Sequence, residues 1–214
     1  MKNLLVSEIF FSINGEGLEI GKPTVFLRLS GCNLDCSWCD TKYANYNAVE
    51  KNIDEILEEI ERINNGIKSV LITGGEPLLQ DIEELVEILH AKGYHISIET
   101  NGSIYHDVLL KIDFISVDIK TPNSKNETKD LDIFNKIVDA IIKRNGQMKA
   151  VISDKDDYLF LKKFINENSF NVPLIIQPCW DKLTYKDLYE LYTNDPINNN
   201  VRILLQIHKV GEIK

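Results

Sequence analysis

The sequence has 214 residues, of which 43% are hydrophobic and 27% charged, and these values are typical of one globular domain with its own core. Its formal net charge of -9 makes DNA and RNA poor partners. The longest apolar runs are too short for a membrane span, and the N-terminal run is too short for a signal peptide, so we expect a reducing cytoplasm.

Apolar strand-like runs alternate with amphipathic stretches along the chain. Strands are predicted at residues 25–29, 70–72, 96–98, 114–117, 148–152 and 174–176. Helices are predicted at 53–63, 82–89, 131–144, 156–168 and 184–192. Strand–helix alternation predicts parallel units of an α/β fold, in a partial or full (β/α) barrel or an open sheet. The polar stretches 122–130 and 194–200 are expected to be surface loops, so residues 1–214 are one domain.

Three cysteines follow the first predicted strand, in the pattern C-x₃-C-x₂-C formed by Cys32, Cys36 and Cys39. Three thiolates without a fourth nearby suit an iron–sulfur cube in which one iron has no protein ligand. A structural zinc ion would need a fourth ligand, such as Cys179 or a histidine, and is the alternative. Cys179 otherwise fits a small buried apolar residue.

Polar or glycine-containing segments follow five of the predicted strands. They are residues 30–32, 73–77, 99–102, 118–120 and 177–180. The carboxyl ends of parallel strands meet at one edge of a sheet, where α/β enzymes bind their ligands. Arg28 lies inside an apolar strand, where an unpaired charge is costly, so we expect it to bind a substrate carboxylate or to form a structural ion pair.

Several motifs together resemble a known family. The cysteine pattern with Trp38, followed by Gly74-Gly-Glu-Pro77, resembles the signatures of radical S-adenosylmethionine (SAM) enzymes. The run Glu8-Ile-Phe-Phe-Ser-Ile-Asn-Gly-Glu-Gly17, the run Cys39-Asp-Thr41 and the closing Gln206-Ile-His-Lys209 are similar to 7-carboxy-7-deazaguanine synthases, which serve queuosine and deazapurine biosynthesis. These segments are scattered from residue 8 to residue 209, so the resemblance extends over nearly the whole chain.

The resemblance implies a shortened (β/α) barrel and a lyase reaction. A 4Fe–4S cluster would cleave SAM, and the resulting radical would take hydrogen from C6 of 6-carboxy-5,6,7,8-tetrahydropterin. Ring contraction with loss of ammonia would give 7-carboxy-7-deazaguanine. The radical comes from the cofactor, so no side chain is assigned as catalytic. The resemblance also implies Mg²⁺, a homodimer, and a flavodoxin or ferredoxin as reductant.

The same resemblance assigns site residues. It places Asn14, Gly15, Glu16, Arg28 and Thr73 at the substrate, and Trp38, Gly75, Glu76, Asp118, Lys120 and Gln177 at SAM. It places Cys32, Cys36 and Cys39 at the cluster and Thr41 at magnesium. Asn14 replaces the family's usual glutamine. Asp118-Ile-Lys120 aligns with a common Ser-Pro-Lys, so Lys120 agrees and the first two residues differ. His208 and Lys209 match a C-terminal pair of the family, or lie at a solvated chain end.

A second hypothesis within the same superfamily is an activase that generates a glycyl radical on a partner protein. Such enzymes share the cysteine triad near the N-terminus. They lack the combination of Asn14-Gly-Glu-Gly17 with Cys39-Asp-Thr41, which favours the deazaguanine synthase.

Overall fold

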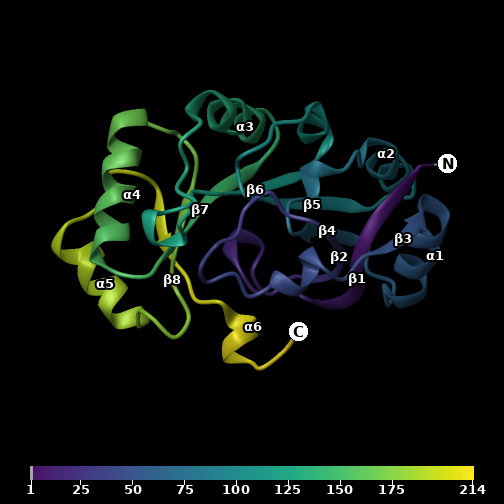
Figure 1. Cartoon of the computed structure of the whole chain (residues 1–214), viewed down its shortest axis with the longest axis horizontal. Coiled ribbons are helices and arrows are strands. Elements are labelled where there is room, and N and C mark those ends of the chain that lie inside the picture. Colours follow the sequence, from purple (N-terminus) through teal and green to yellow (C-terminus); the bar gives the residue numbers. More distant parts are fainter. Residues whose placement is uncertain (1) are drawn as a thin grey trace.

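The computed structural model describes residues 2–214, and its strands form one nine-stranded sheet (Figure 1). The strands are β1 Asn3–Ile13, β2 Pro23–Leu29, β3 Val49–Asn52, β4 Ser69–Gly74, β5 His95–Thr100, β6 Phe114–Asp118, β7 Gly146–Ile152, β8 Leu174–Pro178 and β9 Val201–Ile203. Their order is β3-β1-β2-β4-β5-β6-β7-β8-β9. The pairs that β1 makes with β2 and β3 are antiparallel, and every pair from β2 to β9 is parallel. The sheet is open, with β3 and β9 at its edges, as expected for a shortened barrel.

Within residues 2–214, five α-helices lie between strands of the sheet and a sixth follows β9. They are α1 Ile53–Ile63, α2 Glu83–Ala91, α3 Leu131–Lys143, α4 Lys155–Asn168, α5 Tyr185–Asn194 and α6 Ile207–Val210. Side chains before the first turn fix several helix starts: Asn52 and Thr184 form capping boxes, and Asp154 accepts a hydrogen bond from Asp157 N. Helix α2 stops before Gly93, whose φ of 78° suits glycine. All the predicted strands and α1 to α5 are therefore confirmed.

Three strands were not predicted from the sequence. Strand β1 mixes Ser7 and Glu8 into its apolar residues, and β3 has the polar sequence Val-Glu-Lys-Asn at a sheet edge. Strand β9 is only three residues long. Their pairing depends on neighbouring strands and not on a strong local pattern of their own.

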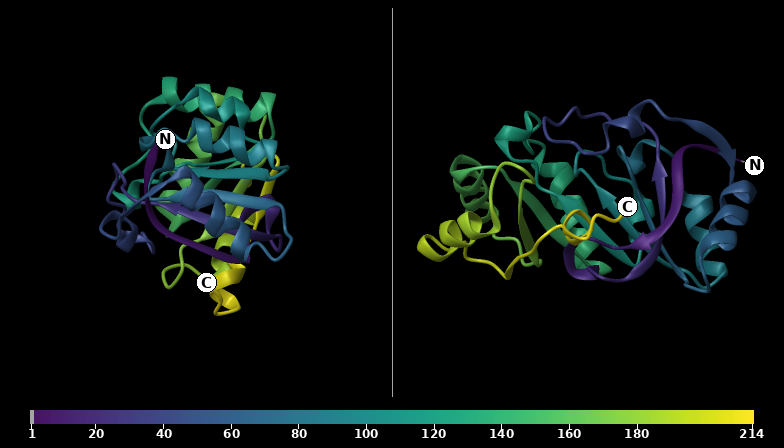
Figure 2. Two further views of the ribbon diagram at one scale, coloured as in Figure 1. Left: turned by 90° about the vertical axis from the view of Figure 1, so that its right-hand side faces the viewer. Right: turned by 90° about the horizontal axis from the view of Figure 1, so that it is seen from below.

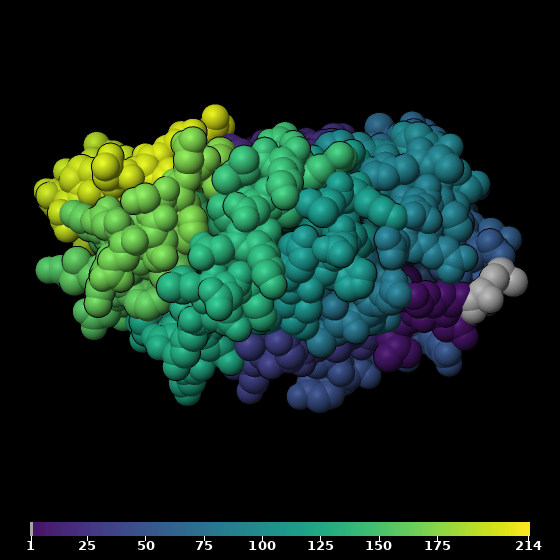
Figure 3. All heavy atoms as spheres, turned by 90° about the horizontal axis from the view of Figure 1, so that it is seen from above, coloured from purple at the N-terminus to yellow at the C-terminus, as the bar shows by residue number. Residues whose placement is uncertain are grey.

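One face of the sheet is apolar and packs against the helices. The other face is polar near the carboxyl ends of the strands. Alternate strand residues such as Ile72, Ile98 and Val117 are buried with the helices in one continuous core. Figure 2 shows the helices outside the curved sheet, and Figure 3 shows α2, α3 and α4 side by side as a continuous cover from teal to green. Among residues 2–214, we find no helix with the length and apolarity needed to cross a bilayer.

The C-terminal segment returns to the start of the sheet. After β9 the chain runs to α6, and Ile207 N donates a hydrogen bond to Gly15 O over 3.0 Å. The ring of His208 packs so closely on Gly15 that a Cβ there would lie 2.1 Å from Nδ1. Figure 1 accordingly shows α6 and the C-terminus beside β1, far from the edge strand β3. This return places Gln206 and His208 at the polar face of the sheet.

Candidate active site

A cavity of about 770 Å³ opens at the carboxyl ends of the parallel strands. Its size suits small-molecule ligands. It is lined by nearly all of the residues expected at the site: Asn14, Gly15, Glu16, Arg28, Cys32, Cys36, Trp38, Cys39, Thr41, Thr73, Gly75, Asp118, Lys120 and Gln177. Of the expected residues, Glu76 alone is not part of the lining.

The cysteine loop and the Gly74-Gly-Glu-Pro77 turn are packed directly against each other. Glu76 N donates a hydrogen bond to Gly31 O over 2.8 Å. A Cβ on Gly75 would lie 2.0 Å from Gly31 O and 2.8 Å from Cys32 Cβ, so only glycine allows this approach. The two motifs that stand far apart in the sequence therefore share one wall of the cavity.

The thiols of the cysteine loop have hydrogen-bond donors around them. Leu34 N lies 3.4 Å from Cys32 Sγ, Asn101 Nδ2 lies 3.9 Å from the same sulfur, and Asn126 Nδ2 lies 3.8 Å from Cys36 Sγ. Such donors stabilise ligating thiolates. Burial raises the pKa of Cys36 above its ordinary value, so metal binding must displace a proton from this thiol.

The donor set fits an iron–sulfur cube. In a cube, each thiolate ligates a different iron, so the three sulfurs surround a larger group. Cys32, Cys36 and Cys39 come from one loop and all line the cavity, so one cluster bound there could be held by all three.

Glu76 lies behind the cavity wall and is fully buried. Its carboxylate accepts hydrogen bonds from Leu78 N over 3.0 Å, Thr100 Oγ1 over 2.9 Å and Asn101 N over 2.7 Å. Burial raises its pKa despite these hydrogen bonds. The side chain thus ties the turn after β4 to the turn after β5, and it holds Asn101 beside the cysteine loop.

A buried lysine that the sequence analysis did not assign lies at the centre of the site. Lys149, on β7, has a side chain only 8% exposed, and its Nζ lies 2.6 Å from Glu16 Oε2, 3.5 Å from Asp118 Oδ1 and 3.6 Å from Glu99 Oε1. Burial opposes its charge, but the surrounding carboxylates raise its pKa well above the ordinary value. The signal was present, because Lys149 interrupts an apolar strand as Arg28 does.

The carboxylate of Glu16 is held by three donors. Besides Lys149, it accepts hydrogen bonds from Gln206 Nε2 over 2.6 Å and from Gln177 Nε2 over 2.9 Å. Burial raises the pKa of Glu16, but Lys149 and the two amides outweigh burial and keep the group ionised. In the described chain, Gln177 Oε1 is buried without a hydrogen-bond partner. This acceptor would be satisfied by an N–H donor of a bound ligand.

Asp118, which differs from the family's usual serine, forms an ion pair with Lys120, which matches the family's lysine. Lys120 Nζ lies 2.6 Å from Asp118 Oδ2, and both side chains are mostly buried. Burial raises the pKa of Asp118, yet Lys120 and Lys149 lower it below its ordinary value. This pair presents an ammonium and a carboxylate between Cys36 and Lys149.

Arg28 forms a structural ion pair, which was one of its two expected roles, and the contact is made through its Nε atom. Its Nε donates a hydrogen bond to Glu8 Oε1 over 2.8 Å. Among residues 2–214, its two Nη atoms make no hydrogen bond, and Arg28 is one of the residues that line the cavity. Thr73 lies on the neighbouring strand, and its Oγ1 donates to Glu99 Oε2 over 3.0 Å.

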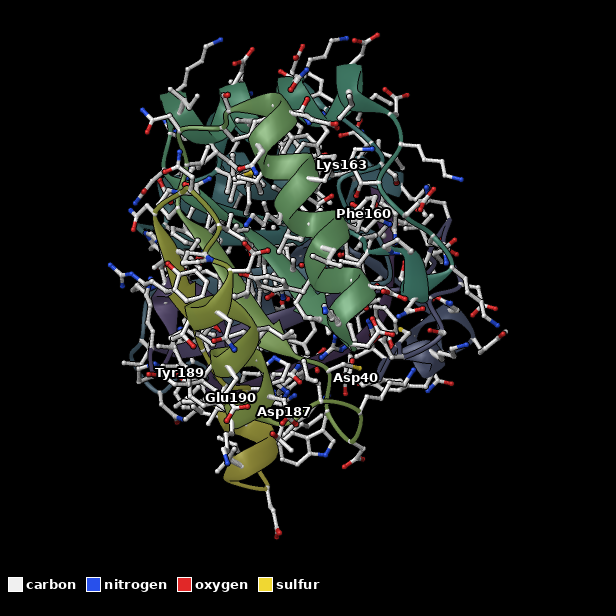
Figure 4. All side chains as sticks on the ribbon, turned by 90° about the vertical axis from the view of Figure 1, so that its left-hand side faces the viewer. Asp40, Phe160, Lys163, Asp187, Tyr189 and Glu190 are labelled. Carbon is white, nitrogen blue, oxygen red and sulfur yellow. The ribbon has the colours of Figure 1, made fainter. Side chains whose placement is uncertain are left out.

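The rim of the cavity is formed by the end of the cysteine loop and the C-terminal segment. Thr41 Oγ1 lies 3.6 Å from Cys39 Sγ, and Lys209 Nζ lies 2.8 Å from Asp40 Oδ2. Lys182 Nζ lies 5.2 Å from the ring centre of Trp38. Figure 4, viewed from the side that carries α4 and α5, labels Asp40 below the end of α4. Lys209 therefore contacts the site and is not simply a solvated chain end.

Cys179 lies just after β8 and is 3% exposed. Burial raises the pKa of its thiol. Its Sγ lies 3.8 Å from Trp180 O. The residue thus packs as a small apolar side chain at the edge of the cavity.

Comparisons with known proteins agree with this geometry. The radical SAM superfamily model matches residues 27–152. The chain is 34% identical over 208 residues to a 7-carboxy-7-deazaguanine synthase of Methanospirillum hungatei, covering 95% of this chain and 83% of the relative. It is 35% identical to the synthase of Thermoplasma acidophilum, covering 97% and 96%. The crystal structure of QueE from Escherichia coli has the same fold, with a TM-score of 0.73 at 24% identity, over 95% of this chain and 94% of that one.

Proposed function

Because the chain belongs to the 7-carboxy-7-deazaguanine synthase family of the radical SAM superfamily, we propose that its cavity converts 6-carboxy-5,6,7,8-tetrahydropterin to 7-carboxy-7-deazaguanine with loss of ammonia. The protein is a radical SAM enzyme. The observation that carries the proposal is that the cysteine loop and the ionised Glu16 face one cavity. Nothing favours the glycyl-radical activase.

Cys32, Cys36 and Cys39 hold the cluster in this proposal. When bound, the cluster and SAM supply the one-electron chemistry that starts the reaction. Asn101 and Asn126 donate toward two of the ligating sulfurs. Gly75 brings the turn after β4 against this loop.

We assign the SAM subsite to the residues between the cluster loop and β8. They are Trp38, Gly75, Asp118, Lys120 and Gln177, with Glu76 holding the wall from behind. Lys120 offers an ammonium for the carboxylate of the methionine end, and Asp118 offers an acceptor for an ammonium or hydroxyl. Gln177 offers its unpaired amide oxygen.

We assign the pterin subsite to the residues from the turn after β1 and from β2 and β4, and it adjoins the SAM subsite where Gln177 binds Glu16. Glu16 is ionised and can accept from the N–C–N edge of a pterin, beside the backbone of Gly15 and the amide of Asn14. Arg28 has its Nη edge available for the substrate carboxylate, and Thr73 lies on the next strand.

We further propose that Thr41 contributes one oxygen to a Mg²⁺ ion. Its hydroxyl lines the cavity beside Cys39. Mg²⁺ prefers oxygen ligands and keeps several waters, so substrate oxygens and water would complete the octahedron. A hydroxyl from the chain then serves to place the ion near the substrate.

Other properties of the enzyme follow from the family as proposals. We propose that residues 1–214 form one radical SAM core, because all nine strands share a sheet. We also propose a homodimer, a flavodoxin or ferredoxin as electron donor, and a location in the reducing cytoplasm, where thiolate-bound clusters persist.

An anaerobic turnover assay tests the proposed function. Reconstituted protein is mixed with SAM, a reductant, Mg²⁺ and 6-carboxy-5,6,7,8-tetrahydropterin, and the products are identified by mass spectrometry. We expect 7-carboxy-7-deazaguanine and ammonia only when SAM is present. A glycyl radical on a partner protein, without any deazaguanine product, would favour the activase instead.

A further inference from the structure

Glu8 has its carboxylate against the guanidinium of Arg28. The two residues face each other across the antiparallel pair of β1 and β2, and Arg28 Nε lies 2.8 Å from Glu8 Oε1. Their side chains are only 18% and 13% exposed, so bulk water screens the pair weakly. The contact uses one of the five guanidinium donors and leaves the Nη donors without a hydrogen bond within residues 2–214, and Arg28 lines the cavity.

A β-bulge in β1 places Glu8 on the cavity side. Val6 pairs with Leu29 and Glu8 with Arg28, so Ser7 is the extra residue. Before the bulge, Val6 packs into the apolar core, and after it Ile9 does so. The extra residue shifts the alternation of side chains by one position. Even-numbered residues face the core before the bulge and odd-numbered residues after it, so Glu8 is turned toward the cavity face.

A tyrosine from the cysteine loop binds the same carboxylate oxygen. Tyr43, in the short helix η2 Lys42–Asn45, donates from its hydroxyl to Glu8 Oε1 over 2.7 Å. Burial and this hydrogen bond raise the pKa of Tyr43 to about 12, so the phenol remains a donor at neutral pH. Lys214 Nζ lies 2.5 Å from the other oxygen, Oε2. The carboxylate is thus fixed on both sides.

Aromatic rings restrict Arg28 further. The rings of Phe10 and Phe26 stack with centroids 4.8 Å apart, and Arg28 Cζ lies 5.7 Å from the centre of Phe10 and 6.0 Å from that of Tyr43. These rings and Glu8 restrict the orientation of the guanidinium. Glu8 itself does not line the cavity, although Arg28, Phe10 and Tyr43 do.

We infer that Glu8 is a positioning residue, which holds Arg28 by its Nε edge so that the Nη edge meets the carboxylate of the substrate. The inference rests on the proposed function, because it names what orients a residue of that substrate subsite. It predicts that binding of the carboxylated substrate depends more on the length of the Glu8 side chain than on its charge. A planar acceptor of the same length keeps the contact with Nε, whereas a shorter carboxylate loses it.

Two substitutions at Glu8 separate the effect of side-chain length from the effect of charge. Glu8→Gln keeps the length and an acceptor oxygen, whereas Glu8→Asp keeps the charge and is one methylene shorter. Each variant, with cluster and SAM bound, is titrated anaerobically with 6-carboxy-5,6,7,8-tetrahydropterin and with 5,6,7,8-tetrahydropterin, which lacks the carboxylate. Glu50→Asp is the matched control, because Glu50 lies on β3 and accepts from Asn3 Nδ2 outside the cavity.

We expect Glu8→Asp to weaken binding of the carboxylated pterin by about tenfold and to leave the other pterin unchanged. Glu8→Gln should stay within about threefold of the parent protein for both ligands. Equal losses for both pterins, no loss in Glu8→Asp, or a tenfold loss in Glu8→Gln would each overturn the inference. If Glu8→Asp does not fold, Glu8→Gln still tests the inference, because a tenfold loss of binding in that variant would overturn it.

The parent protein separates this inference from the proposed function. If it does not prefer the carboxylated pterin, the substrate assignment fails, and the role of Glu8 fails with it. If it does prefer that ligand and Glu8→Asp keeps the full preference, only the positioning role is overturned.

Discussion

Lys149 Nζ lies 2.6 Å from Glu16 Oε2 at the floor of the cavity, so a buried cation from β7 fixes the carboxylate that follows β1. The same ammonium faces Asp118 and Glu99. One ammonium group therefore holds together carboxylates from three segments that are far apart in the sequence. The cavity gains ionised groups that are already oriented before a ligand binds.

Removing this charge should destabilise the fold as well as the site. Lys149→Met leaves buried carboxylates without their shared partner, and we expect a loss of about 3–5 kcal/mol in the free energy of unfolding at neutral pH. Urea denaturation of the protein measures it. Lys163→Met, on the exposed part of α4 (Figure 4), is the control and should change little. Equal stabilities for the two variants would contradict the central role of Lys149.

Glu19 should make the free energy of unfolding depend on pH in the acid range. Burial raises its pKa, but hydrogen bonds from His95, Lys22 and Ser97 outweigh burial and lower the pKa to about 2. A lowered pKa stabilises the folded state above the ordinary value of 4.5, and this stabilisation is lost as the pH falls from 4.5 toward 2. We expect the unfolding free energy of Glu19→Gln to fall less steeply over that range. Identical slopes for both proteins would show that Glu19 is not linked to folding.

Cys36→Ala should abolish cluster binding and leave the fold intact. The residue is a cluster ligand in our proposal, is only partly buried and is not part of the apolar core. Iron content and visible absorbance after anaerobic reconstitution measure the first effect, and circular dichroism the second. Cys179→Ala is the matched control and should retain its iron. Loss of metal in Cys179→Ala would instead support the zinc alternative.

Gly75→Ala should disturb the contact between the two motifs. The new Cβ would lie 2.0 Å from Gly31 O, and we expect a loss of about 1–3 kcal/mol together with lower iron content. Gly93→Ala adds a Cβ that meets nothing within 4 Å, so it carries only backbone strain and should retain its iron. Normal cluster loading in Gly75→Ala would show that the loop does not need this close approach.

Position along the chain made much of the site predictable. Polar residues that follow apolar strands must meet at one edge of a parallel sheet, and Thr73, Asp118 and Gln177 do line one cavity. Arg28 and Lys149 carry the same signal, a charge inside an apolar strand, but only Arg28 was assigned a role from the sequence. Recognising Lys149 needed its partners, which come from other strands.

Contacts between distant loops could not be predicted in this way. The stretch 122–130 was expected to be a surface loop, yet Ser124 is fully buried and its carbonyl accepts a hydrogen bond from Ser37 N over 3.1 Å. Asn126 in the same stretch reaches Cys36 Sγ. The composition of a polar segment indicates a loop but does not indicate which other loop it binds. The bulge at Ser7 was hidden for a similar reason, because it is defined by pairing with β2.

The most direct test of the central claim is spectroscopy of the anaerobically reconstituted protein. The account predicts about four irons and four labile sulfides per chain, and an electron paramagnetic resonance signal of the reduced cluster that changes when SAM is added. Zinc without labile sulfide would contradict it. So would an iron–sulfur signal that does not respond to SAM, because the cluster would then have no iron open to the cofactor.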